Sequence, residues 1–123
     1  MIGLGSNVAG QRRRAIEEAL EWLRQTGRNM VTSDIYETKP WGNPESCHSY
    51  RNAVAKLETP LALETLNELL KKYETEHGRD DEARRSGLVP IDLDIVIWDG
   101  KALRPNEMNR DYFTIGFKQT EKR

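Results

Sequence analysis

The feature that most constrains this sequence is an apolar run that contains two carboxylates, Ile91-Asp92-Leu93-Asp94-Ile95-Val96-Ile97-Trp98. Side chains alternate between the faces of a β-strand, so Asp92 and Asp94 would project from one face, about 6.5–7 Å apart. Burying two unpaired like charges is costly, and a shared divalent cation would remove that cost. Oxygen ligands alone favour Mg²⁺, which commonly binds one or two carboxylates together with substrate phosphates. The alternative is an edge strand whose outer face is simply solvated.

Length and composition indicate one ordinary globular domain. The chain has 123 residues, 37% hydrophobic and 32% charged, with a formal net charge of −1. No overall basic field would attract nucleic acid. Cys47 is the single cysteine, which excludes an internal disulfide and fits a reducing compartment. The sequence has no apolar stretch of about 18 residues and no apolar leader, so we expect a cytoplasmic monomer without membrane contact.

The hydrophobic spacing predicts two helices and four strands in the order β-α-β-β-α-β. Strands are expected at 1–5, 31–36, 50–57 and 91–98, helices at 15–23 and 63–73, with Thr59-Pro60 as the second helix start. We therefore expect an α+β, ferredoxin-like sandwich, with a four-stranded antiparallel sheet and two helices on one face. The other face would be free to carry a site. We expect a single domain over 1–123, a turn at Asp99-Gly100, and a frayed end from about residue 118.

Basic and aromatic residues near the carboxylate strand suggest partners for it. Arg79, Arg84 and Arg85 lie in a charged loop between 78 and 90, and guanidinium groups bind phosphate oxygens in bidentate fashion. Pairing with the acids of the same loop is the competing explanation. Tyr50 and Asn52 share one strand face and could meet a heterocycle with amide-like edges. They could equally be core or rim residues.

Two further pairs of residues could contact a ligand or could simply be ordinary surface residues. Thr38 and Trp41, in the loop before Tyr50, could close over a bound ring. Lys71 and Glu74 face the same end of the second helix, where surface charge alone would explain them.

Taken together, these motifs resemble the 6-hydroxymethyl-7,8-dihydropterin pyrophosphokinases, enzymes of folate biosynthesis that transfer pyrophosphate from ATP to a pterin alcohol. The matching order and spacing run from residue 1 to about 99. The stretches that carry the resemblance are Gly3-Leu4-Gly5-Ser6-Asn7, Tyr36-Glu37-Thr38-Lys39-Pro40-Trp41-Gly42, Tyr50-Arg51-Asn52-Ala53, Glu74 with Gly78-Arg79, and Ile91-Asp92-Leu93-Asp94-Ile95.

The resemblance implies a role for each matching residue. Asp92 and Asp94 would hold two Mg²⁺ ions, and Arg79 would contact phosphate beside them. The nucleotide would be bordered by Lys71, Glu74, Ile95 and Arg85. Arg84 or Arg110 could substitute from a neighbouring position for an arginine of the family pattern that this chain lacks. The pterin would be held by Thr38, Trp41, Tyr50, Asn52 and a stacking ring, either Phe113 or Tyr112. ATP would be the co-substrate, and Arg79, Asp92 and Asp94 the catalytic residues.

The sequence departs from the family pattern at three positions. The family has an Arg-Trp-Gly-Pro-Arg type run before the aspartate strand, and Ser86 and Val89 replace its tryptophan and its second arginine. Asn106 replaces a histidine. These changes leave a second hypothesis open, a catalytically impaired or altered-substrate relative that still binds pterin or nucleotide. An RNA-binding module with the same strand order is a third, although its aromatic motif is absent.

Overall fold

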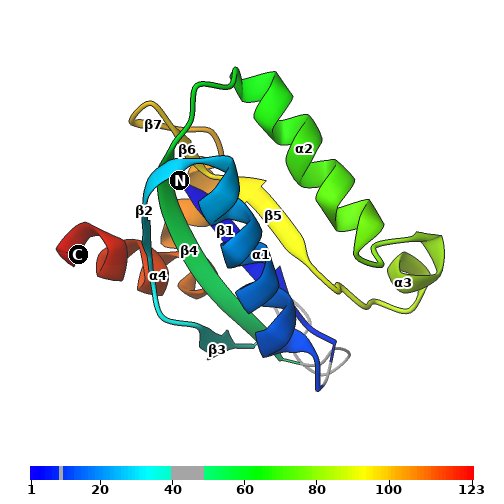
Figure 1. Cartoon of the computed structure of the whole chain (residues 1–123). Coiled ribbons are helices and arrows are strands. Elements are labelled where there is room, and N and C mark those ends of the chain that lie inside the picture. Colours follow the sequence, from blue (N-terminus) through cyan, green and yellow to red (C-terminus); the bar gives the residue numbers. More distant parts are fainter. Residues whose placement is uncertain (9, 40–48) are drawn as a thin grey trace.

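The computed structural model describes residues 1–8, 10–39 and 49–123 of this α+β protein. A five-stranded antiparallel sheet forms its centre, with the order β2-β4-β1-β5 and with β3 also paired to β4. β1 (Ile2–Ser6) lies between β4 (Tyr50–Glu58) and β5 (Asp92–Ile95). β2 (Arg28–Thr32) and β3 (Tyr36–Thr38) pair with opposite ends of β4. Figure 1 shows the sheet with two helices in front of it.

Helices α1 (Arg12–Thr26) and α2 (Leu63–Glu76) cover one face of the sheet, as the hydrophobic spacing predicts. Their buried residues recur at helical intervals, so one apolar stripe of each helix faces the strands. Alternate residues of the strands complete this core. Its members include Leu4, Ile16, Leu23, Ala53, Ala55, Leu70 and Leu93.

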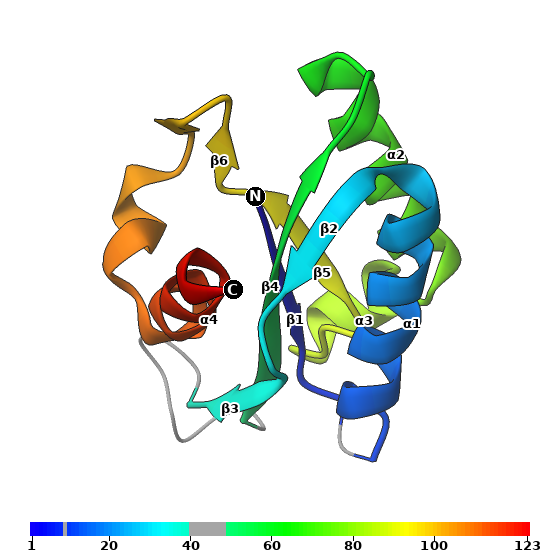
Figure 2. The ribbon, with the colours of Figure 1, turned by 60° about the vertical axis from the view of Figure 1, so that its left-hand side comes forward.

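A third long helix, α4 (Asp111–Lys122), lies on the opposite face, as Figure 2 shows. Phe113 of α4 packs against Val54 and Val96, which forms a smaller second cluster. The expectation of a free face is therefore wrong in part. α4 continues to Lys122, past the expected start of fraying at residue 118, and the Arg123 guanidinium donates to the Thr32 carbonyl and the Asp34 carboxylate.

Two expected strands are each divided in the structure. The segment 31–36 contributes to β2 and β3, and between them Ser33 exchanges hydrogen bonds with the main chain of Val54. The run 91–98 ends its central strand at Ile95, after which β6 (Ile97–Trp98) and β7 (Lys101–Ala102) form a hairpin. Asp99 and Gly100 make its turn with φ of 48° and 77°, as the dipeptide predicts.

The connections around α2 also differ from expectation. Ala62, and not Thr59, occupies the N-cap of α2, while the Thr59 hydroxyl accepts from the Leu61 amide. The loop 78–90 contains the short helix α3 (Asp81–Arg85), whose N-cap Asp80 accepts from the Ala83 amide. Within the described residues, no helix has the length and apolar character needed to cross a bilayer.

Candidate active site

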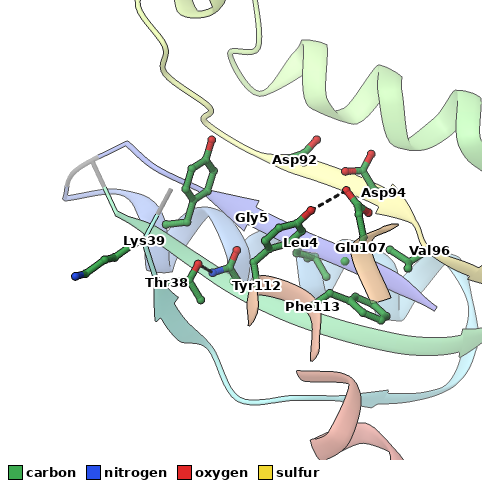
Figure 3. A pocket seen from close by; sticks show the side chains of 13 residues that line it. Leu4, Gly5, Thr38, Lys39, Asp92, Asp94, Val96, Glu107, Tyr112 and Phe113 are labelled. Atoms are coloured by element: carbon green, nitrogen blue, oxygen red, sulfur yellow. Dashed lines mark hydrogen bonds between the residues drawn. The ribbon is translucent and has the colours of Figure 1, made fainter. Parts of the chain in front are cut away.

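A cavity of about 280 Å³ lies between the sheet and the segment formed by the 3₁₀ helix η1 (Pro105–Asn109) and α4. Figure 3 shows it from close by. It lies on the sheet face opposite α1 and α2, over the middle of β1, the first residues of β4, and β5. Its lining residues are Gly3, Leu4, Gly5, Thr38, Lys39, Tyr50, Asn52, Asp92, Asp94, Val96, Glu107, Tyr112 and Phe113.

The floor of the cavity is main chain at Gly3 and Gly5. Because side chains alternate along β1, Ile2 and Leu4 enter the main core while these two positions face the cavity. A Cβ at Gly5 would lie 3.3 Å from the Asn52 Oδ1 atom, tighter than an ordinary contact. The glycines of the Gly-Leu-Gly motif thus leave a flat surface that a planar ring can approach.

One wall brings together three of the predicted pterin-site residues. Asn52 is buried on β4, and its Nδ2 donates to the Thr38 Oγ1 atom of β3 over 2.7 Å. Tyr50 lies two residues away on the same face. The pairing of Thr38 with Tyr50 and of Tyr36 with Asn52 explains this meeting. Trp41 lies outside the described residues.

The two candidate stacking rings occupy different environments. Phe113 is 1% exposed and packs into the cluster with Val54 and Val96, whereas Tyr112 is half-buried. The Tyr112 hydroxyl donates to the Glu107 carboxylate over 3.2 Å, as Figure 3 shows. Burial, followed by the nearby Glu107, raises the pKa of Tyr112 to about 12. Both rings line the cavity, and Tyr112 is the more exposed of the two.

Asp92 and Asp94 lie on the cavity side of β5, so the prediction that they share a face is confirmed. They pair in register with Gly5 and Gly3 of β1. Burial, and then the charge of Asp94, raise the pKa of Asp92 to about 7, against the effect of Arg79. Burial also opposes ionisation of Asp94, but the hydrogen bond from Asp92 and the cations Lys71 and Arg104 hold its pKa below the ordinary value.

Three cations surround the carboxylate pair. The Arg79 guanidinium donates to Asp92 at 2.5 Å, and Lys71 Nζ lies 3.1 Å from Asp94. Arg104, which follows β7, reaches Asp94 from the other side at 3.2 Å. Sequence reasoning missed Arg104, because it is an isolated arginine in a segment without periodicity. Glu107 was missed as a lining residue for the same lack of a motif, and Lys39 was missed because the motif that contains it assigned no role to its side chain.

Lys71 and Glu74 form hydrogen bonds with the outer edge of β5, a role that the sequence did not predict. β5 has no strand on its outer edge within the described residues, and α2 supplies hydrogen bonds there instead. The Leu93 amide donates to Glu74 over 2.7 Å, and Lys71 Nζ donates to the Leu93 carbonyl over 2.9 Å. Glu74 is 5% exposed and also lies 3.3 Å from Arg79. These two residues therefore fix the strand that carries the aspartates.

Asn7 connects the first motif with the segment before β5. Its amide group accepts from the Val89 amide and donates to the Gly87 carbonyl, and its own main chain donates to the Val89 carbonyl. The side chain is completely buried. Asn7 of the Gly-Ser-Asn motif thus binds the main chain of Val89. Val89 is the residue that replaces the arginine of the family pattern.

None of the seven predicted nucleotide-binding residues lines the cavity, although Lys71 and Arg79 contact Asp94 and Asp92. Arg84 and Arg85 are exposed on α3, where Arg84 pairs with Asp81 at 3.3 Å. Ile95 is buried in the main core on the other face of the sheet. Arg110 lies at the N-cap of α4.

The donor set of the site fits a magnesium ion. Two carboxylates that share a hydrogen bond, one of them with a raised pKa, mark a place where a divalent cation would replace a proton. Among the described residues, no third acidic, histidine or cysteine side chain completes a protein-only site. The remaining ligands would then be phosphate and water oxygens, which is typical of Mg²⁺ bound with a nucleotide.

Comparison with known proteins agrees with this geometry. Residues 1–121 match the family described as 7,8-dihydro-6-hydroxymethylpterin-pyrophosphokinase. Three similar curated proteins are each named 2-amino-4-hydroxy-6-hydroxymethyldihydropteridine pyrophosphokinase. The one from Porphyromonas gingivalis is 37% identical over 100 residues, which cover 78% of this chain and 66% of that protein. The one from Haemophilus influenzae is 33% identical over 93% of this chain and 71% of its own length.

The third protein, from Aquifex aeolicus, is 34% identical over 98% of this chain and 78% of its own length. This chain therefore spans just under two thirds of the Porphyromonas protein and somewhat more of the other two. Family match, identity and coverage lead to one conclusion: the chain belongs to the 7,8-dihydro-6-hydroxymethylpterin-pyrophosphokinase family.

Proposed function

We propose that this protein transfers pyrophosphate from ATP to the hydroxymethyl group of 6-hydroxymethyl-7,8-dihydropterin, a step of folate biosynthesis. The observation that carries the proposal is the placement of the cavity directly beside Asp92 and Asp94. A ring on the glycine floor would have its substituent next to the carboxylates. The family name of the relatives gives the ring and the transferred group their identity.

In the proposed reaction the pterin hydroxymethyl oxygen attacks the β-phosphorus of ATP. A bond forms between these two atoms, the bond from the β-phosphorus to the α,β-bridging oxygen breaks, and the electron pair leaves with AMP. The proton of the attacking hydroxyl passes to solvent water. Positioning and charge neutralisation supply most of the catalysis in such transfers.

The chain's own residues divide this task. Asn52 would offer its amide to the edge of the pterin, and Tyr50 and Tyr112 would confine the ring. Arg79 and Arg104, which contact the carboxylates from two sides, would turn toward the phosphates. Two Mg²⁺ ions held by Asp92 and Asp94 would neutralise charge on the triphosphate.

Four further assignments are part of the same proposal. The strand order β2-β4-β1-β5 with α1 and α2 on one face supports a ferredoxin-like core, to which β3, η1 and α4 are added. We also propose that the protein acts as a monomer in the cytoplasm and binds no nucleic acid. These statements rest on the sequence.

The test is an assay for AMP formed from ATP, Mg²⁺ and the pterin alcohol. We expect turnover by the wild type, and a loss of at least about 100-fold in Asp92→Asn and Asp94→Asn, because each removes charge that a cation needs. Asp99→Asn is the matched control, since it makes the same change in the exposed β6–β7 turn. Absence of AMP from the wild type, in a protein shown to be folded, would reject catalysis.

A second function is favoured by one observation. The set of cations that the family pattern places near the phosphates is incomplete here. Val89 is present where the pattern has an arginine, and neither Arg84 nor Arg85 lines the cavity. A relative that binds pterin and nucleotide without efficient transfer would show both ligands in calorimetry but no AMP. This result would identify the altered-function alternative and retain the binding site.

A further inference from the structure

The Tyr36 hydroxyl bridges one turn of the helix that covers the cavity. It donates to the Tyr112 carbonyl over 2.7 Å and accepts from the Gly116 amide over 3.1 Å. In an ordinary α-helix the amide of Gly116 would donate directly to the carbonyl of Tyr112, four residues earlier. A side chain from β3 is therefore attached to the first turns of α4 at two points.

This attachment is possible because α4 lies very close to the sheet at Gly116. A Cβ at Gly116 would lie 2.5 Å from a Val54 methyl carbon and 2.9 Å from the Tyr36 hydroxyl. No real Cβ is found at such distances, so only glycine permits this approach. Tyr36 is itself partly buried, and burial raises the pKa of its hydroxyl, which stays protonated as a donor.

The contact leads directly to the wall of the cavity. Tyr112, whose carbonyl accepts from Tyr36, presents its ring to the cavity and donates through its hydroxyl to Glu107. Glu107 in turn lies 3.8 Å from Arg104, which contacts Asp94. The height of α4 above the sheet therefore sets the position of the Tyr112 ring opposite the glycine floor.

We infer that Tyr36 is a positioning residue for the pterin: its hydroxyl holds the first turn of α4 so that Tyr112 closes the cavity at the width of one planar ring. Tyr36 does not line the cavity itself. The inference rests on the proposed function for the identity of the ring. It predicts that Tyr36 affects pterin binding much more than nucleotide binding, because the carboxylates and Arg79 are fixed by β5 and α2 and Arg104 lies before η1, outside the turn that Tyr36 holds.

The experiment compares wild type, Tyr36→Phe and Tyr73→Phe by calorimetry with two probes. The first probe is a non-hydrolysable ATP analogue with Mg²⁺, and the second is 6-hydroxymethylpterin added to the protein saturated with that analogue. Tyr36→Phe keeps the packed ring and removes only the bridging oxygen. Tyr73→Phe removes the same atom from a buried ring in the core on the other face of the sheet.

We expect the Kd for the pterin to rise about tenfold in Tyr36→Phe, because small displacements of a positioning wall are costly. The Kd for the ATP analogue should stay within about twofold, and Tyr73→Phe should match the wild type for both probes. A Tyr36→Phe variant that binds pterin like the wild type, or that loses both ligands equally, overturns the inference.

Measurements on the wild type distinguish failure of the proposed function from failure of the inference about Tyr36. If the wild type binds no pterin, the proposed function fails and the inference falls with it. If the wild type binds pterin and forms AMP while Tyr36→Phe is unaffected, only the inference fails. Amide exchange at Gly116, faster in Tyr36→Phe than in Tyr73→Phe, tests the bridge itself without any ligand.

Discussion

Asp92 holds a proton in a pH range where an ordinary aspartate is ionised. Burial and the adjacent Asp94 raise its pKa from 3.8 to about 7. A carboxyl group whose pKa is higher in the folded than in the unfolded state favours folding below its ordinary pKa, and this contribution disappears as the pH rises through about 7. Asp94 shifts in the other direction, so its own effect appears only under acidic conditions.

We therefore predict that the metal-free wild type loses stability relative to Asp92→Asn between about pH 4 and about pH 7, as the pH rises from the ordinary pKa of Asp92 to its raised value. Mg²⁺ should raise the melting temperature of the wild type more at the upper end of this range, because a protonated carboxyl is a poor ligand. Denaturant unfolding at a series of pH values measures the first effect and thermal scans with and without Mg²⁺ the second. If the free energies of unfolding of the wild type and Asp92→Asn changed in parallel with pH, the raised pKa of Asp92 would be contradicted.

Tyr112 and Phe113 are adjacent, yet they are expected to serve different purposes. Phe113→Ala should lower the free energy of unfolding by about 3–5 kcal/mol, because the ring is fully buried among Val54 and Val96. Tyr112→Ala should cost much less stability but should weaken pterin binding. Urea unfolding and calorimetry on both variants check this reciprocal pattern. Equal effects on both properties would show that the two rings act as one unit.

At the scale of elements, the outer edge of β5 depends on α2. Glu74→Ala would leave the Leu93 amide without its acceptor and would remove a carboxylate from Lys71 and Arg79. We predict a loss of about 2–4 kcal/mol in the free energy of unfolding, typical of a broken buried polar network. Glu76→Ala, on the exposed side of α2, is the control and should change stability by less than about 0.5 kcal/mol. Similar unfolding midpoints for the two variants would exclude this structural role.

The elements that could be predicted are those whose signal is local. The stripes of α1 and α2 and the alternation of β4 follow from residues close in the sequence. α4 could not be predicted, because its buried stripe consists of Phe113, Gly116 and Thr120, only one of which is a large apolar residue. The separation of β2 from β3 depends on Ser33 and Val54, 21 residues apart. Such contacts have no counterpart in a short window of sequence.

The candidate site shows the same division. Strand alternation alone places Asp92 and Asp94 on one face, and the same rule joins Tyr50 to Asn52. Arg104 and Glu107 reach the carboxylates and Tyr112 only through the path of the chain after β5. No residue spacing in the sequence predicts how the chain runs after β5. The resemblance supplied chemical roles, but it gave no indication that Lys71 and Glu74 support a strand edge.

At the scale of the whole molecule, both layers of packing share the same strands. β4 gives Ala53 and Ala55 to the cluster under α1 and α2, and Val54 to the cluster under α4. We therefore predict one cooperative unfolding transition for the chain, as expected of a single domain. Far-UV circular dichroism and tryptophan fluorescence should give coincident denaturation curves. An earlier transition that removes α4 alone would contradict the prediction of a single domain.

The main-chain floor at Gly3 and Gly5 has a consequence for the design of inhibitors. A compound that rests on this surface meets atoms common to every amino acid, which no point mutation can delete. A mutation there can only add bulk, and added bulk would obstruct the natural ligand as well as the compound. Escape from such an inhibitor would have to arise in the walls.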